Sequence, residues 1–288
     1  MQVVTTIADF RRAHRDLAGA SLGFVPTMGF LHDGHIELVR RAVADNDAVT
    51  ASIFVNPLQF GPTDDLETYP RDFDRDRRML EAAGCEFLFY PEVTEIYSAD
   101  GSSDVTVVPG RIASVLEGAS RPVHFRGVAT VVAKLFNIVQ PDRAYFGQKD
   151  GQQVAVVQRM VHDLSMPVEI VVVPTVRDPD GLAMSSRNTY LNTEQRVAAP
   201  AVFRSLTNAS RRFASGERDA DVLRAVMMET LAAEPLADVD YVSVADHETL
   251  AEVEGLVERD VMVSLAVQIG PARLIDNVVL TVPGQFPS

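Results

Sequence analysis

Short apolar runs alternate with longer segments of helical spacing along roughly the first 175 residues. The runs that predict buried strands cover residues 23–25, 49–55, 86–90, 143–146 and 168–173. Apolar residues recur at helical intervals over residues 36–44, 72–83, 128–139 and 152–164. This alternation predicts a parallel sheet with helices on both faces. Ligands bind such sheets at the carboxyl ends of the strands.

The pattern changes after residue 187. Residues 193–233 have helical spacing, and strands are predicted over residues 238–244, 261–268 and 272–282. We therefore expect an α/β fold: a Rossmann-like doubly wound domain over residues 1–176 and a smaller C-terminal α+β lid domain over residues 177–288. The last residues, 283–288, are expected to fray.

Two histidines three residues apart follow the first of these strands. The turn residues from Pro26 to Gly29 precede them, and the helical pattern begins at Ile36. His32 and His35 therefore share nearly the same face of a helix start, beside unpaired N–H groups and the positive end of the helix dipole. The arrangement predicts an anion site with two titratable donors, suited to polyphosphate. A solvated helix end is the alternative, which the preceding strand and the flanking glycines disfavour.

A second polar segment strengthens this interpretation. Ser185, Ser186 and Arg187 place two hydroxyls and a guanidinium in consecutive positions, and both groups bind phosphate oxygens. Alone, the segment is more typical of a polar turn. His-x-Gly-His followed by Met-Ser-Ser-Arg, however, resembles the adenylate-forming nucleotidyltransferase superfamily, which includes the class I aminoacyl-tRNA synthetases with their HIGH and KMSKS motifs. Ala183 stands where KMSKS has its first Lys, so phosphate charge there must come from Arg187 and Lys149.

Further blocks narrow the resemblance to one family. They are Ser-Ile-Phe-Val-Asn-Pro-Leu-Gln-Phe-Gly at 52–61, Tyr-Pro-Arg-Asp at 69–72, Arg-Pro-Val-His-Phe-Arg-Gly at 121–127 and Phe-Gly-Gln-Lys-Asp-Gly-Gln-Gln at 146–153. With the histidine motif they resemble the pantoate–β-alanine ligase family, in the family's order, over about residues 20–192. The resemblance implies ATP-dependent condensation of pantoate with β-alanine through pantoyl adenylate, with release of AMP and pyrophosphate. It also implies a homodimer.

The resemblance assigns catalysis to His32, His35, Lys149, Ser185 and Arg187. The family gives His35 a proton-donor role, although we rank charge stabilisation above proton transfer because pyrophosphate hardly needs a strong acid to leave. The implied ATP site consists of Met28, Gly29, Phe30, Leu31, His32, Asp33, Gly34, His35, Gly147, Gln148, Lys149, Asp150, Val176, Met184, Ser185, Ser186 and Arg187. Mg²⁺ is expected on the nucleotide phosphates, held mostly through substrate oxygens and water. The sequence does not identify which residues, if any, bind it directly.

Pantoate needs apolar walls and neutral hydrogen-bonding groups. By resemblance, Gln59 and Gln153 hold its hydroxyls and carboxylate, and a neutral amide does so without a salt bridge that would blunt the nucleophile. The walls are expected to include Met28, Phe60 and Phe146. If residues 151–161 are helical, the side chains at 152 and 153 diverge by about 100°, so only one of them can face the pocket.

Three further positions carry weaker expectations. For His124, the sequence favours equally a role in lining the site and a structural role in a turn. Asp76 could steer Mg²⁺, although a solvated helix start is the favoured interpretation of its acidic run. Gly151 is smaller than many residues that could stand there, and we expect it to loosen the turn after Asp150.

Bulk properties agree with an enzyme of the cytoplasm. The single cysteine, Cys85, excludes an intrachain disulfide, and its surroundings are typical of a buried strand thiol. No apolar run is long enough for a membrane span, and the N-terminus lacks a signal pattern. A net charge of −14 argues against nucleic acid as a partner. Two alternatives remain: a nucleotidylyltransferase that transfers AMP or CMP to a small phosphate substrate, and a non-catalytic nucleotide sensor.

Overall fold

The computed structural model describes residues 1–288 except residues 16, 18, 63, 65 and 284–288. The chain divides into two compact units. The first consists of Met1–Gly147 and Val156–Pro174, and the second of Gln148–Ala155 and Thr175–Ser288. The fraying expected at the C-terminus falls, apart from Pro283, outside the described residues. Each unit has its own sheet and its own core.

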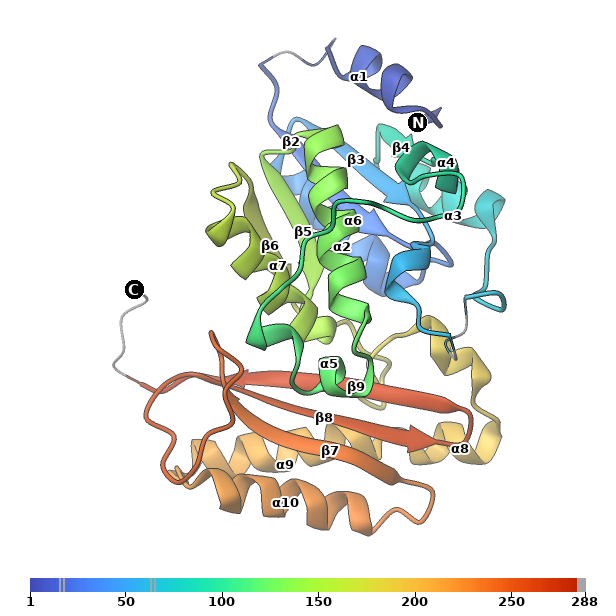
Figure 1. Ribbon diagram of the computed structural model, residues 1–288. Coiled ribbons are helices and arrows are strands. Elements are labelled where there is room, and N and C mark those ends of the chain that lie inside the picture. The colour runs from blue at the N-terminus through green and yellow to red at the C-terminus, as the bar shows by residue number, and fades with distance from the viewer. Residues whose placement is uncertain (16, 18, 63, 65, 284–288) are drawn as a thin grey trace. The chain divides into compact units, whose positions relative to one another are not determined.

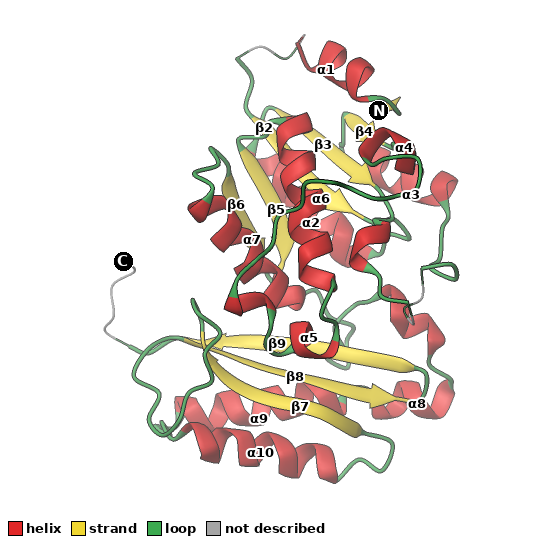
Figure 2. Cartoon of the chain, viewed as in Figure 1, coloured by secondary structure: helices red, strands yellow, loops and turns green. Residues whose placement is uncertain are grey.

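Within the described residues, the first unit contains a six-stranded parallel sheet in the order β1-β4-β3-β2-β5-β6 (Figures 1 and 2). Its strands are β1 (Gln2–Val4), β2 (Leu22–Thr27), β3 (Ala48–Ile53), β4 (Phe87–Phe89), β5 (Arg143–Gly147) and β6 (Glu169–Val173). The strand order reverses between β2 and β5, and such switch points are where doubly wound sheets bind ligands. The predicted sheet is confirmed. The short edge strand β1 is an addition, because three residues show no measurable periodicity.

Helices cover both faces of this sheet. Successive residues of β2 show this: Val25 packs in one core cluster with Val39 of α2 (Asp33–Asp45), whereas the ring of Phe24 lies 6.4 Å from that of Phe136 on α6 (His124–Val139). Side chains alternate between faces along a strand, so α2 and α6 lie on opposite sides. The other helical segments of this unit are α1 (Ile7–Arg15), η1 (Pro57–Gln59), α3 (Phe73–Ala82), α4 (Val93–Ile96), η2 (Arg111–Ala113), α5 (Glu117–Ser120) and part of α7 (Gly151–Asp163).

The second unit places two helices against one face of an antiparallel sheet, β7-β8-β9 (Figure 1). Its core joins Leu206 and Leu223 of the helices to Val263 and Leu265 of the central strand. The predicted α+β character is confirmed. The elements are η3 (Gln148–Asp150), η4 (Ser186–Tyr190), α8 (Thr193–Ala198), α9 (Ala201–Ala214), α10 (Ala220–Ala232), β7 (Asp238–Asp246), β8 (Val261–Ile269) and β9 (Ala272–Leu280).

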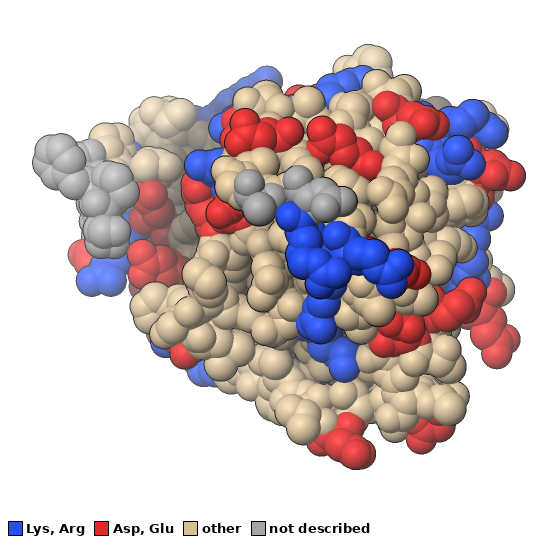
Figure 3. Space-filling view, turned by 90° about the horizontal axis from the view of Figure 1, so that it is seen from above, with Lys and Arg blue, Asp and Glu red and all other residues tan. Residues whose placement is uncertain are grey.

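The surface carries both signs of charge. On the face shown in Figure 3, Lys and Arg side chains gather in separate groups among acidic ones rather than in one continuous basic surface. Among the described residues, no helix has the length and apolar character that crossing a membrane requires.

Candidate active site

The two predicted histidines cap the start of α2. The Nδ1 atom of His32, the N-cap residue, accepts the N–H of Gly34 at 3.2 Å, and Nδ1 of His35 accepts the N–H of His32 at 3.2 Å. The two ring centroids are 4.0 Å apart. Because each Nδ1 accepts a hydrogen bond, the proton of each neutral ring lies on Nε2. The two rings therefore direct their donor N–H groups, on Nε2, from the positive end of the α2 dipole, which suits an anionic ligand. The backbone N–H groups of His32, Gly34 and His35 already bond within the helix start.

The turn before these histidines is held by a buried carboxylate. Oδ2 of Asp76, on α3, accepts the N–H of Phe30 at 2.6 Å, and Oδ1 accepts the N–H of Leu31 at 2.8 Å. The turn has left-handed backbone at both Gly29 (φ 84°) and Phe30 (φ 49°). A non-glycine residue is strained in that region, so the two bonds stabilise a conformation that the chain would otherwise leave.

The favoured interpretation of Asp76 as part of a solvated helix start is therefore wrong, because its exposure is 1%. The interpretation as a solvated helix start is correct for the preceding acidic residues, Asp72 and Asp74, which are exposed. Helical periodicity explains the difference, since position 76 turns inward beside the buried Leu80. Burial raises the pKa of Asp76, while the two N–H bonds and Arg75 oppose that rise.

The amide of Gln59 is oriented by a buried polar network. Nδ2 of Asn56 donates to Oε1 of Gln59 at 3.0 Å, and Oδ1 of Asn56 accepts the hydroxyl of Tyr97 at 2.8 Å. Nε2 of Gln59 points to Sδ of Met28 at 3.0 Å. An amide can be placed either way round, but this network selects one orientation. Met28 and Gln59, both predicted for pantoate, are thus in contact.

The start of α6 packs directly on the backbone of Gln59. A Cβ atom at Gly127 would lie 2.3 Å from a carbonyl oxygen of η1, so only glycine fits this approach. Nδ1 of His124 lies 3.1 Å from the carbonyl oxygen of Gln59, and Arg121 bonds the same oxygen at 3.4 Å. Arg121 also pairs with Asp64 at 2.8 Å. Burial alone would raise the pKa of Asp64, but this arginine lowers it. His124 therefore contacts a predicted site residue through its backbone.

The predicted apolar walls differ in their surroundings. The Phe60 ring lies 5.9 Å from that of Tyr69, next to the Gln59 loop. Phe146 is 4% exposed and meets Phe136 edge-on at 6.5 Å, inside the core beneath α6. Their contact with pantoate stays a prediction.

Lys149 lies in η3 of the second unit, and its Nζ is 3.3 Å from Oδ1 of Asp150. The next residue, Gly151, was expected to loosen this turn, and that expectation is wrong. A Cβ atom there would lie 2.7 Å from Sδ of Met262, so the glycine allows close packing. The helix predicted from this point is present, and it turns Gln152 inward (5% exposed) while Gln153 stays partly exposed.

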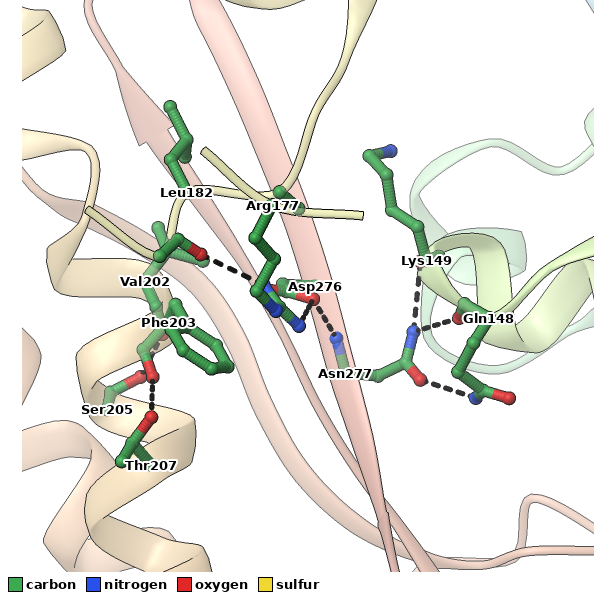
Figure 4. Close-up of polar contacts among 12 residues, drawn as sticks. Gln148, Lys149, Arg177, Leu182, Val202, Phe203, Ser205, Thr207, Asp276 and Asn277 are labelled. Atoms are coloured by element: carbon green, nitrogen blue, oxygen red, sulfur yellow. Dashed lines mark hydrogen bonds and ion pairs between the residues drawn. The ribbon is translucent and has the colours of Figure 1, made fainter. Parts of the chain in front are cut away.

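The Met-Ser-Ser-Arg segment follows a small hairpin in the second unit. The N–H of Met184 donates to the carbonyl of Val176 at 3.0 Å, and Ser185 caps η4 by accepting the N–H of Arg187 at 3.3 Å. The hairpin is anchored by Arg177, whose guanidinium pairs with both oxygens of the buried Asp276 (Figure 4).

Neither unit shows a metal centre within its described part. Among the residues described, no group of three or more His, Cys, Asp or Glu side chains could hold a metal ion. Both oxygens of Asp76, the weaker candidate for steering Mg²⁺, already accept backbone N–H groups. Its geometry is that of a structural clamp.

Comparison with known proteins identifies the family. The model of the pantoate–β-alanine ligase family matches residues 2–279. The chain belongs to this family. A pantothenate synthetase of Herpetosiphon aurantiacus is 58% identical over 97% of this chain and 100% of its own length. The crystal structure of pantothenate synthetase from Thermus thermophilus aligns with a TM-score of 0.90 at 48% identity, covering 96% of this chain and 99% of that one.

A second solved structure of the family includes ligands. The pantoate–β-alanine ligase of Francisella tularensis, complexed with β,γ-ATP and β-alanine, aligns with a TM-score of 0.77 at 34% identity over 97% of both chains. The family prediction from the short motifs is thereby confirmed, as is the Rossmann-like fold with a smaller C-terminal sheet.

Some residues that shape the site carried no motif signal. Tyr97 and Asn277 are buried polar residues far from the motifs in the sequence, yet Tyr97 bonds Asn56 and Asn277 bonds the backbone at Lys149. Asn56 itself stood in a recognised block without an assigned role. The available signal for Asn277 was a polar pair, Asp-Asn, inside an otherwise apolar strand pattern.

Proposed function

We propose that this chain is the enzyme that joins pantoate to β-alanine with ATP, through pantoyl adenylate, and releases AMP and pyrophosphate. The observation that carries this proposal is the family match over residues 2–279. Relatives named pantothenate synthetase match along their whole length, and the Francisella tularensis ligase is complexed with β,γ-ATP and β-alanine.

In the first half-reaction, a carboxylate oxygen of pantoate attacks the α-phosphorus of ATP, the new P–O bond forms, and pyrophosphate leaves with the bonding pair. Charge accumulates on phosphate oxygens, so preorganised donors supply most of the catalysis. His32 and His35 offer Nε2–H groups fixed by their Nδ1 contacts. We assign the remaining cationic and hydroxyl donors to Lys149, Ser185 and Arg187. The backbone from Met28 to Gly34 is proposed to lie along the nucleotide, as are the predicted groups around Gly147 and Met184.

Pantoate is proposed to bind through Gln59 and Gln153, with Met28 among the apolar contacts. The orientation of the Gln59 amide is already set by Asn56, so binding needs little reordering of this side chain. In the second half-reaction, the amine nitrogen of β-alanine attacks the acyl carbon, the C–N bond forms, and AMP leaves. The amine loses its proton to solvent or base.

Mg²⁺ is proposed to arrive with ATP, bound to phosphate oxygens and water. The two N–H bonds to the carboxylate of Asp76 support a metal held by the substrate rather than by this residue. A homodimer, a cytoplasmic location, and a boundary at residue 176 between a substrate-binding domain and a lid are further proposals, made from the family resemblance and the sequence pattern.

One assay tests the function. The protein is incubated with ATP, Mg²⁺ and pantoate, β-alanine is then added, and AMP is followed. AMP that depends on both organic substrates supports the ligase, whereas a failure to form AMP from these substrates would count against it. His35→Asn should abolish most of the AMP. The matched control is His162→Asn, because that ring is 78% exposed on α7.

A further inference from the structure

The backbone at Lys149 is held by one buried amide. Nδ2 of Asn277, on β9, donates to the carbonyl oxygens of Gln148 at 2.8 Å and Lys149 at 2.9 Å. Its Oδ1 accepts the side-chain Nε2 of Gln148 at 2.7 Å (Figure 4). The side chain is 4% exposed. Both amide hydrogens and the amide oxygen of Asn277 therefore form hydrogen bonds with two successive residues of η3.

We propose that Asn277 is a positioning residue for the adenylation step, which it serves by fixing the backbone from which Lys149 projects. This inference rests on the proposed function of Lys149. Two hydrogen bonds to consecutive carbonyls fix two peptide planes, and these planes set the direction of the Cα–Cβ bond between them. In Figure 4 the Lys149 side chain runs away from Asn277, so the asparagine acts on the backbone and leaves the ammonium to its ligand.

The strand presents this amide on the correct face because its residues alternate. Leu274 and Asp276 lie on the side of β9 that faces the helical core, where Asp276 pairs with Arg177. Asn277 lies on the opposite side with Met262 of β8, against Gly151. Adjacent strand residues thus hold two separate segments: one carries Lys149 and the other leads into the Met-Ser-Ser-Arg loop.

Close packing at Gly151 supports the same conclusion. A Cβ atom there would lie 2.9 Å from both Nδ2 and Oδ1 of Asn277. The glycine therefore leaves the amide room to reach both carbonyls. A methyl group at this position would push the amide off its acceptors, although alanine is itself a better helix former than glycine.

The test is a double-mutant cycle in the full chain. Asn277→Asp keeps the shape but replaces two donors with an acceptor facing two carbonyl oxygens. We expect it to lower kcat for AMP formation about 10- to 100-fold, as a small misplacement of a reacting group does, while the KM for β-alanine changes less than about two-fold. In a Lys149→Ala background the same change should add less than about three-fold, because the group it positions is gone.

Two further variants keep the test decisive. Ser264→Ala is the matched control, because Ser264 lies directly opposite Asn277 on β8, is 3% exposed, and its hydroxyl has no hydrogen-bond partner among the described residues. It should leave kcat unchanged. If Asn277→Asp does not fold, Gly151→Ala is tested in its place. It should likewise lower kcat for AMP formation while leaving the KM for β-alanine nearly unchanged.

The outcomes separate the two proposals. The role of Asn277 would be overturned if Asn277→Asp alone left kcat equal to that of the unmodified chain. It would also be overturned if Asn277→Asp lowered kcat by the same factor in the Lys149→Ala background as in the unmodified chain. A failure of the unmodified chain to form AMP from ATP, pantoate and β-alanine would instead refute the proposed function.

Discussion

Removing the Asp76 carboxylate should destabilise the turn at Gly29 to Leu31 that precedes the histidines. In Asp76→Ala, the N–H groups of Phe30 and Leu31 lose acceptors at 2.6 and 2.8 Å. Each unpaired buried donor costs about 1–3 kcal/mol. The Phe30 amide is only partly buried and water can replace its acceptor, so we expect a total loss of about 2–5 kcal/mol in the free energy of unfolding. Typical domains have about 5–15 kcal/mol in all, so the loss is large.

Urea unfolding followed by circular dichroism measures this loss, and ATP saturation curves measure its effect on the turn. We expect the order of stability to be unmodified chain, Asp76→Asn, then Asp76→Ala, because the amide keeps one acceptor oxygen. The KM for ATP should rise in both variants. Asp74→Ala, an exposed change on the same helix turn, is the control and should stay within about 0.5 kcal/mol. An Asp76→Ala variant as stable as this control would refute the clamp.

The pH dependence provides a second check on Asp76. Burial raises its pKa in the folded protein above the usual value, so the folded state retains this proton to higher pH than the unfolded chain does. That contribution to stability is fully present below the unfolded pKa and is lost as the pH rises through the folded pKa. The stability difference between the unmodified chain and Asp76→Asn should therefore shrink on going from acid toward neutral pH. A difference that grows instead would show that the N–H bonds outweigh burial.

Three other changes test the site. Lys149→Ala should lower turnover about 10²-fold or more with an unchanged unfolding midpoint, and near-normal turnover would count against its role. Gln153→Ala should raise the KM for pantoate with little change in kcat, so identical pantoate saturation would contradict the assignment. Gly127→Ala would place a methyl 2.3 Å from a carbonyl oxygen of η1. It should reduce stability by about 1–3 kcal/mol in urea and weaken pantoate binding through Gln59, whereas an unchanged midpoint would show that α6 can shift freely.

The fold was largely predictable from the sequence because its central elements are long and strongly periodic. The apolar strands β2, β3 and β5, together with α2, α3 and α7, were all predicted within a few residues of their bounds. The predicted start of α6 came four residues late, since His124 to Gly127 break the apolar spacing. The single-turn helices α4 and α5 are too short for a 3.6-residue period to show.

The chemistry of the site was predictable where residues adjoin in sequence, and hidden where contacts cross the fold. His32 and His35 are neighbours on one helix turn, so their proximity follows from spacing alone. Asp76 and the Phe30 backbone are 46 positions apart, and Asn277 lies 128 positions from Lys149. No periodicity links such pairs. Helical periodicity places position 76 on the inward face of α3, but only tertiary packing brings its carboxylate to the backbone of Phe30.

The departure from the KMSKS pattern has a structural reason. Ala183 is 4% exposed and forms a bridge with Arg177 in the hairpin, while its carbonyl accepts Nδ2 of Asn188 at 3.0 Å. A lysine side chain would have to enter this packed position, and an unpaired ammonium is rarely buried. A cation for phosphate therefore cannot come from position 183 without repacking the hairpin. Our proposal therefore assigns the phosphate-binding cations of the second unit to Arg187 and Lys149, and the backbone of that lysine is held by Asn277 of β9.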